Sequence, residues 1–172
     1  MRRFLFLSLI ISFASLNLSS CSTLGAYFDS PSRQYRSYVE RKVSEAELFD
    51  RARLMLRVRA LMANEALKSE QEKLSPGHSI ELNKHATQLL VGIEISGREA
   101  LQIDELGFFL DERKAVSVKE ISHSGVIEQH YPFAFPYLRL FLVDFDVFDL
   151  AGKSLSLKVQ TRVGSLKLSI KQ

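Results

Sequence analysis

The 172-residue chain has one cysteine, no tryptophan and four prolines. A single cysteine cannot form a disulfide within the chain, so oxidation adds nothing to its folding. The Cys–Trp–Cys core of antibody domains is also excluded. The sequence contains no CxxC, HExxH or GxSxG motif, and these are short signatures of metal sites and activated serines. We therefore expect no catalytic residue, no metal site and no cofactor, and we do not expect an enzyme.

Long apolar runs are scarce as well, and the one that stands out is at the N-terminus. Arg2 and Arg3 precede an apolar stretch from Phe4 to about Leu16, which is too short to cross a bilayer comfortably. This order of charged, apolar and small polar residues is typical of a signal peptide. The stretch ends in Leu18-Ser19-Ser20-Cys21.

These four residues resemble the lipobox of bacterial lipoproteins, in which a leucine and two small residues precede a cysteine. The resemblance implies a signal peptide at 1–20, cleavage after Ser20, and a mature chain that begins with an acylated Cys21. Acyl chains add about 0.8 kcal/mol per buried CH₂, so two or more give stable anchoring. The alternative is an ordinary secreted protein with an incidental cysteine beside its cleavage site.

The next residue is Ser22 rather than aspartate. By resemblance to enterobacterial sorting rules, this favours the outer membrane, with the protein facing the periplasm, and retention in the inner membrane is the alternative. We expect residues 21–30 to form a short lipidated tether.

A strong excess of one charge is absent from the mature chain. The formal net charge is +3, and Arg2 and Arg3 supply two of these charges, which leaves about +1. The sequence pI near 9.0 therefore does not indicate nucleic-acid binding, which needs a concentrated basic face.

The segment 31–75 is expected to be helical. Ser30-Pro31 is typical of a helix start, with an N-cap followed by proline, and predicts a helix over 31–42. Ser44 and Glu47 have the spacing of a capping box, which Val43 and Leu48 extend as a hydrophobic staple. A second helix is therefore predicted from Glu45 to about Lys73, before the breaker at 75–77. The alternative is one unbroken helix through Ser44.

Two apolar stripes appear when the second predicted helix is plotted at 100° per residue. We expect a helix packed from both sides, with one stripe on the strand domain and the other on the first helix or on another protein. The stripes consist of Leu54, Met55, Val58, Leu61 and Met62, and of Phe49, Leu56, Ala60, Ala63 and Leu67.

From about residue 86 the apolar pattern changes to an alternation with period two, which is typical of strands. Turn residues separate the segments, and no helical pattern lies between the later ones. The strand candidates are 87–96, 106–111, 115–121, 137–148, 155–161 and 165–171. We therefore predict an α+β protein, with a helical segment followed by an antiparallel, immunoglobulin-like β-sandwich over 84–172.

The layout as a whole resembles that of uncharacterised proteobacterial envelope lipoproteins with an immunoglobulin-like domain. The similarity is diffuse over residues 30–172, and the lipobox is its only specific motif. It implies no catalytic residue.

Four groups of residues could carry chemistry. His123 and His130, with Glu128 between them, could meet on zinc or lie in a solvated loop, and His78 and His85 have no metal spacing. Of the acids Asp144, Asp146 and Asp149, the first two share a strand side that could bind calcium or face water. The arginines 51, 53, 57 and 59 could form a basic patch or a charge-balanced face. Phe133, Phe135 and Tyr137 could cap the sandwich or form an exposed patch.

The function expected from these patterns is a lipid-anchored, non-catalytic structural or protein-interaction module of the bacterial envelope. Its expected partners are the membrane, through the lipid, and an unidentified envelope protein, with no nucleic acid. The alternative is an envelope lipoprotein that binds a small ligand or a metal ion through the loops of the strand domain.

Overall fold

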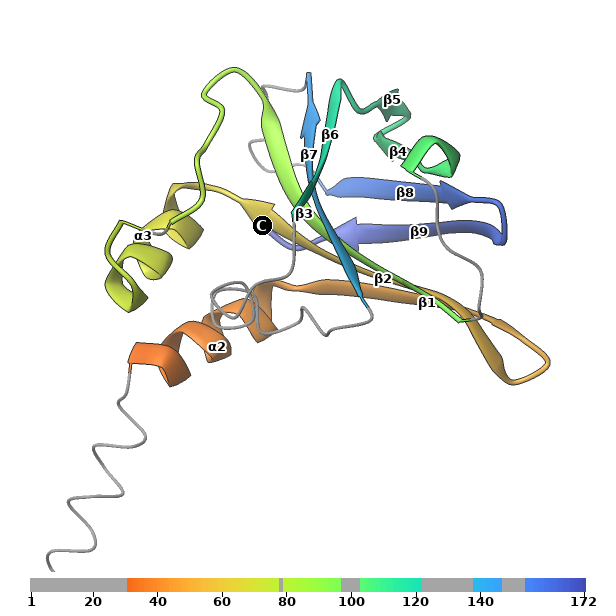
Figure 1. The fold of residues 1–172 in the computed structure, drawn as a ribbon, viewed down its shortest axis with the longest axis horizontal. Helices are drawn as coiled ribbons and strands as arrows, with labels where there is room; N and C mark the ends of the chain where they lie inside the picture. The colour runs from red at the N-terminus through yellow and green to blue at the C-terminus, as the bar shows by residue number, and fades with distance from the viewer. Residues whose placement is uncertain (1–30, 78, 97–102, 122–137, 147–153) are drawn as a thin grey trace, which may run out of the picture.

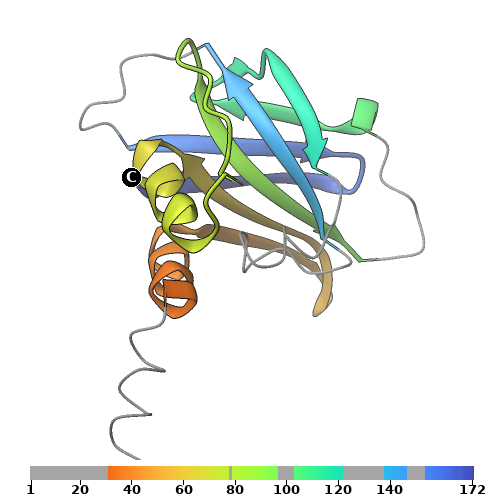
Figure 2. The ribbon, with the colours of Figure 1, turned by 60° about the vertical axis from the view of Figure 1, so that its left-hand side comes forward.

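Two antiparallel sheets face each other, and two helices cover the outer face of the larger sheet (Figures 1 and 2). The computed structural model describes residues 31–77, 79–96, 103–121, 138–146 and 154–172. Cys21 and its flanking residues lie outside these ranges. Within them, no helix has both the length and the apolar character needed to cross a membrane.

The first helix, α2, spans Pro31–Lys42, and the second, α3, spans Glu65–Leu74. The predicted helix over 31–42 is confirmed, because proline at the first position suits the helical backbone. Asn64 caps α3, since its side-chain oxygen accepts a hydrogen bond of 2.9 Å from the Leu67 amide.

The chain between the two helices is a β-hairpin, and the predicted helix is wrong over this stretch. β1 covers Ser44–Asp50 and β2 covers Arg53–Ala63. The long helix expected from Glu45 to Lys73 is therefore reduced to α3. The Ser44 hydroxyl does not cap a helix but accepts a hydrogen bond of 3.0 Å from the Lys171 amide.

The two apolar stripes of the predicted helix arise because most of their residues belong to β2, a strand that is buried on both faces. Leu56, Val58 and Ala60 point into the space between the sheets. Leu61 and Ala63 point to the other face, beneath the helices. A strand covered on both sides reads as a nearly continuous apolar run, which can be mistaken for a buried helix.

β2 continues directly into the larger sheet, whose order is β1-β2-β3-β7-β6. The further strands are β3 (Thr87–Ile95), β6 (Ser117–Ile121) and β7 (Arg139–Phe145). Because β1 and β2 pair alongside β3, the sheets begin at residue 44 and not at 84, and no separate helical segment covers 31–75.

The smaller sheet has the order β5-β4-β8-β9. Its strands are β4 (Gly107–Leu110), β5 (Arg113–Lys114), β8 (Leu155–Thr161) and β9 (Gly164–Ile170), and the short 3₁₀-helix η1 (Ile103–Glu105) precedes them. Each strand candidate predicted after residue 86 overlaps an observed strand, and β9 begins one residue before its candidate. The fold is thus a β-sandwich-like α+β arrangement, as expected at that level of detail.

Two apolar cores hold these layers together. The first lies between the sheets, where the Phe108 and Phe141 rings pack with their centroids 5.8 Å apart. The second lies between the helices and the larger sheet, where Tyr35 and Val39 of α2 pack with Leu90 and Leu140. Burial of each large apolar side chain contributes about 1.5–3 kcal/mol, so α2 is held firmly on the sheet.

Candidate functional site

The site begins with two strand edges that come from opposite ends of the chain. β1 is the edge strand of the larger sheet and β9 is the edge strand of the smaller one. They lie side by side without pairing through their backbones. The outward N–H and C=O groups of an edge strand are available to another strand.

β1 and β9 meet along a line where contacts that involve side chains, and not ladder hydrogen bonds between the backbones, join the two strands. At one end the Lys171 amide donates to the Ser44 hydroxyl at 3.0 Å. At the other end Leu48 lies against Gly164, where an added Cβ would be 2.6 Å from the Leu48 Cδ2 atom. Gly164 also has a φ of +147°, which residues with a side chain rarely adopt, so the backbone favours glycine there.

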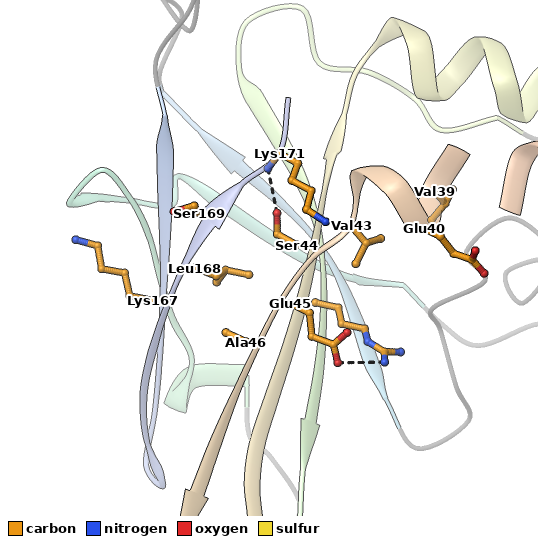
Figure 3. A pocket seen from close by; sticks show the side chains of 11 residues that line it. Val39, Glu40, Val43, Ser44, Glu45, Ala46, Lys167, Leu168, Ser169 and Lys171 are labelled. Atoms are coloured by element: carbon orange, nitrogen blue, oxygen red, sulfur yellow. Dashed lines mark hydrogen bonds and ion pairs between the residues drawn. The ribbon is translucent and has the colours of Figure 1, made fainter. Parts of the chain in front are cut away.

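An open groove of about 800 Å³ follows this line. Figure 3 shows Ala46 and Leu168 between the two strands, while Val39 and Val43 approach from the end of α2. The full lining consists of Val39, Glu40, Val43, Ser44, Glu45, Ala46, Arg59, Lys167, Leu168, Ser169 and Lys171. The groove therefore has an apolar floor and two polar walls.

The wall on the β1 side is charge-balanced. Arg59 donates to Glu45 at 3.1 Å, and next to this pair Arg57 reaches Glu47 at 2.6 Å and Glu94 at 2.9 Å. The hydrogen bond with Glu47, opposed by burial and supported by the neighbouring carboxylates, raises the pKa of the Arg57 guanidinium above its ordinary value. Opposite charges on neighbouring strands stabilise a sheet.

The wall on the β9 side is basic. Lys167 and Lys171 come from β9 and the residue after it, and β9 contains no acidic residue. Neither lysine forms an ion pair within the part of the chain that the structure describes. In Figure 3 the Lys171 side chain points towards Val43 and β1, whereas Lys167 extends to the side of β9 that faces away from β1, so Lys171 is the lysine that an acidic group entering the groove would meet.

The four arginines predicted as one group are divided between two places. Arg57 and Arg59 belong to the charge-balanced face on β1–β3. Arg51 and Arg53 lie at the turn between β1 and β2, and among the described residues they have no ion-pair partner. The pairing of Arg57 with Glu47 links two strands, so it could not be read from helical spacing.

The aspartates and histidines form no common site in the described ranges. Asp144 accepts a hydrogen bond of 2.9 Å from Gln88 Nε2, which supports the sheet, and Asp146 is exposed just beyond β7. His85 is exposed. Within these ranges no three His, Cys, Asp or Glu side chains are close enough to hold a metal ion. The following predicted residues lie outside the described part: Cys21, His78, His123, Glu128, His130, Phe133, Phe135, Tyr137 and Asp149.

The sequence reasoning missed the groove, because β1 was interpreted as helix. A signal was present in residues 44–48, Ser-Glu-Ala-Glu-Leu, where Glu45 and Glu47 alternate with the inward-facing residues. That period of two predicts a half-buried strand.

No protein-family model matches the chain, and the comparisons with curated proteins and with solved structures found no match either.

Proposed function

We propose that this protein is a lipid-anchored bacterial envelope protein that acts as a non-catalytic protein-interaction module at the periplasmic face of the outer membrane. The support for the anchor is the lipobox-like sequence that ends at Cys21. The support for the interaction is the groove between β1 and β9, two strand edges that pair with no further strand in the described part of the chain.

The groove suits an extended segment of a partner protein. A peptide that adds to a sheet edge gains backbone hydrogen bonds, and its alternate side chains provide specificity. Here the alternate side chains would reach the apolar floor at Ala46 and Leu168. Lys167 and Lys171 favour acidic side chains on the segment, and they disfavour the edge-to-edge pairing of identical chains. The proposed partner is therefore an envelope protein with an acidic, extended segment.

The anchor is tested by metabolic labelling with a palmitate analogue. The wild-type protein is expected to be labelled and to sediment with membranes, and the Cys21→Ala variant is expected to lose the label and the sedimentation. Equal labelling of the two proteins would contradict the proposal, whatever the groove binds.

The groove is tested in the same cells with a photo-crosslinking residue at Ser169, which lines the groove. The matched control is Lys119, an exposed position on β6, which is the other edge strand of the larger sheet. Crosslinks to a protein are expected from position 169 only, and they should weaken in a Lys167→Glu/Lys171→Glu background. No crosslink from 169, or the same products from both positions, would remove the groove from the proposal.

A further inference from the structure

The tip of the β1–β2 hairpin carries an exposed aromatic ring. Phe49 is 54% exposed, and in the described residues Val116 is the other large apolar side chain exposed to a comparable degree. Phe49 stands opposite Leu54, so both side chains point to the same side of the hairpin. A single exposed ring is ordinary on a protein surface, so Phe49 indicates a binding site only together with the charges and the position of the tip.

The backbone of the tip holds this ring away from the sheet. The register of β1 and β2 shifts between Leu48 and Phe49, and such a bulge bends and twists a hairpin. The turn that follows has φ values of 45° at Arg51 and 68° at Ala52. Asp111 and Glu112, in the turn between β4 and β5, have the same left-handed backbone, which is the ordinary geometry of a two-residue hairpin. The turn therefore fixes the shape of the tip and does not by itself mark a site.

The charges at the tip favour an anionic surface. Arg51 and Arg53 outnumber the single acid Asp50, and none of the three has an ion-pair partner among the described residues. Arginine guanidinium groups bind phosphate with two parallel hydrogen bonds. A ring flanked by arginines therefore suits a phosphate-bearing lipid surface, where the ring enters the interface and the arginines bind headgroups.

The position of the tip agrees with such a contact. In Figure 1 the hairpin tip and the N-terminal end of α2 both lie on the lower side of the molecule, at opposite ends of its longest axis. Residues 21–30 join Cys21 to α2, and a chain of this length spans at most about 35 Å. A lipid on Cys21 would keep this lower side close to the membrane, and a flat membrane beneath it would meet the tip as well.

We infer that the β1–β2 hairpin tip, with Phe49, Arg51 and Arg53, is a second membrane contact that binds the phosphate-bearing lipids around the anchor. The inference rests on the proposed lipid anchor. Its consequence is that the anchored domain stands in one orientation, with the groove between β1 and β9 held at a fixed height above the membrane.

The absence of tryptophan makes a direct test available. Phe49→Trp places a single fluorescent reporter at the tip. Val116→Trp places one in the link between β5 and β6, which lies on the upper side of the molecule in both views, away from the tip. The lipidated, full-length mature protein of each variant is reconstituted into vesicles of phosphatidylethanolamine and phosphatidylglycerol with brominated acyl chains. Circular dichroism checks that both variants keep the fold.

We expect a blue-shifted emission and strong bromine quenching for the tryptophan at 49 but not at 116. In the Phe49→Trp background, Arg51→Gln should lower the equilibrium constant for contact of the tip with the membrane about fivefold, because one arginine near an anionic surface contributes about 1 kcal/mol. High salt should have the same effect.

Equal quenching at positions 49 and 116 would overturn the inference, and so would quenching that Arg51→Gln and salt leave unchanged. Vesicle flotation shows whether the protein is attached to the membrane at all, so it distinguishes failure of the tip contact from failure of the proposed anchor. Protein that floats with the vesicles but shows no quenching at 49 refutes the tip contact alone. Wild-type protein that never carries the lipid refutes the anchor on which the inference depends.

Discussion

The Gln71 side chain connects both helices to the chain that follows them, and its replacement is expected to loosen this connection. Gln71 is fully buried in α3. Its Nε2 atom donates to the Tyr35 hydroxyl of α2 at 3.2 Å, and its Oε1 atom accepts from the Ile80 amide at 2.9 Å. Gln71→Met keeps the length and most of the volume of the side chain but removes both interactions.

The magnitude follows from the groups that lose their partner. A buried amide without an acceptor costs about 1–3 kcal/mol, which applies to Ile80, and loss of the hydrogen bond to Tyr35 costs about 1 kcal/mol. We therefore expect Gln71→Met to lower the free energy of unfolding by about 2–4 kcal/mol. For a domain of this size each kcal/mol shifts Tm by about 2–4 °C, so Tm should fall by roughly 4–16 °C.

Urea and thermal unfolding followed by circular dichroism measure both quantities. Gln160→Met is the matched control, because Gln160 is exposed on β8, and it should stay within about 0.5 kcal/mol of the wild type. A double-mutant cycle with Tyr35→Phe should give a coupling energy of about 1 kcal/mol. If Gln71→Met were as stable as Gln160→Met, the hydrogen bonds of Gln71 would not hold the helices in place.

Two further predictions concern the hairpin turn and a tyrosine. Arg51→Asn/Ala52→Gly should raise the free energy of unfolding by about 1 kcal/mol, because Asn-Gly suits the left-handed backbone of this turn, and a lower urea midpoint would contradict the turn geometry. Burial, followed by the charge of Glu70, raises the pKa of Tyr38, so the unfolded chain loses this proton first and stability should fall as the pH rises above about 10. In urea titrations at several pH values, the Tyr38→Phe variant should lose less stability above about pH 10 than the wild type. An unchanged dependence of stability on pH would argue against the raised pKa of Tyr38.

Local patterns were sufficient for β8 and α2, each of which buries one face. Leu155, Leu157 and Val159 of β8 alternate with more exposed residues, and they do point into the core between the sheets. Proline at the start of α2 was a sufficient signal for that helix. In these segments the periodicity of the side chains and the local backbone preference agree with the tertiary fold.

The β1–β2 hairpin shows why local patterns fail elsewhere. Residues 53–63 are rich in Leu, Met, Arg and Ala, which are good helix formers. Tertiary pairing overrides this preference, because β2 gains partners on both edges and apolar cover on both faces. Its turn consists of Arg51 and Ala52 in place of the usual Asn-Gly, so the strongest short-range sign of a hairpin is missing.

The groove depended on a contact that no local pattern contains. Its walls combine residues 44–46 with residues 167–171, and only the order of the strands brings them together. The charges of the two walls were visible in the sequence, but the absence of a strand between them was not.

The line between β1 and β9 also has a consequence for the order in which the molecule assembles. Ser44 and Lys171 are 127 positions apart, so their hydrogen bond closes a loop that contains almost the whole described chain. Contacts of such high sequence separation carry the largest loop-closure cost and tend to form late. Because this line is held by side chains and contains no ladder hydrogen bond, it can also part while every strand pair stays intact.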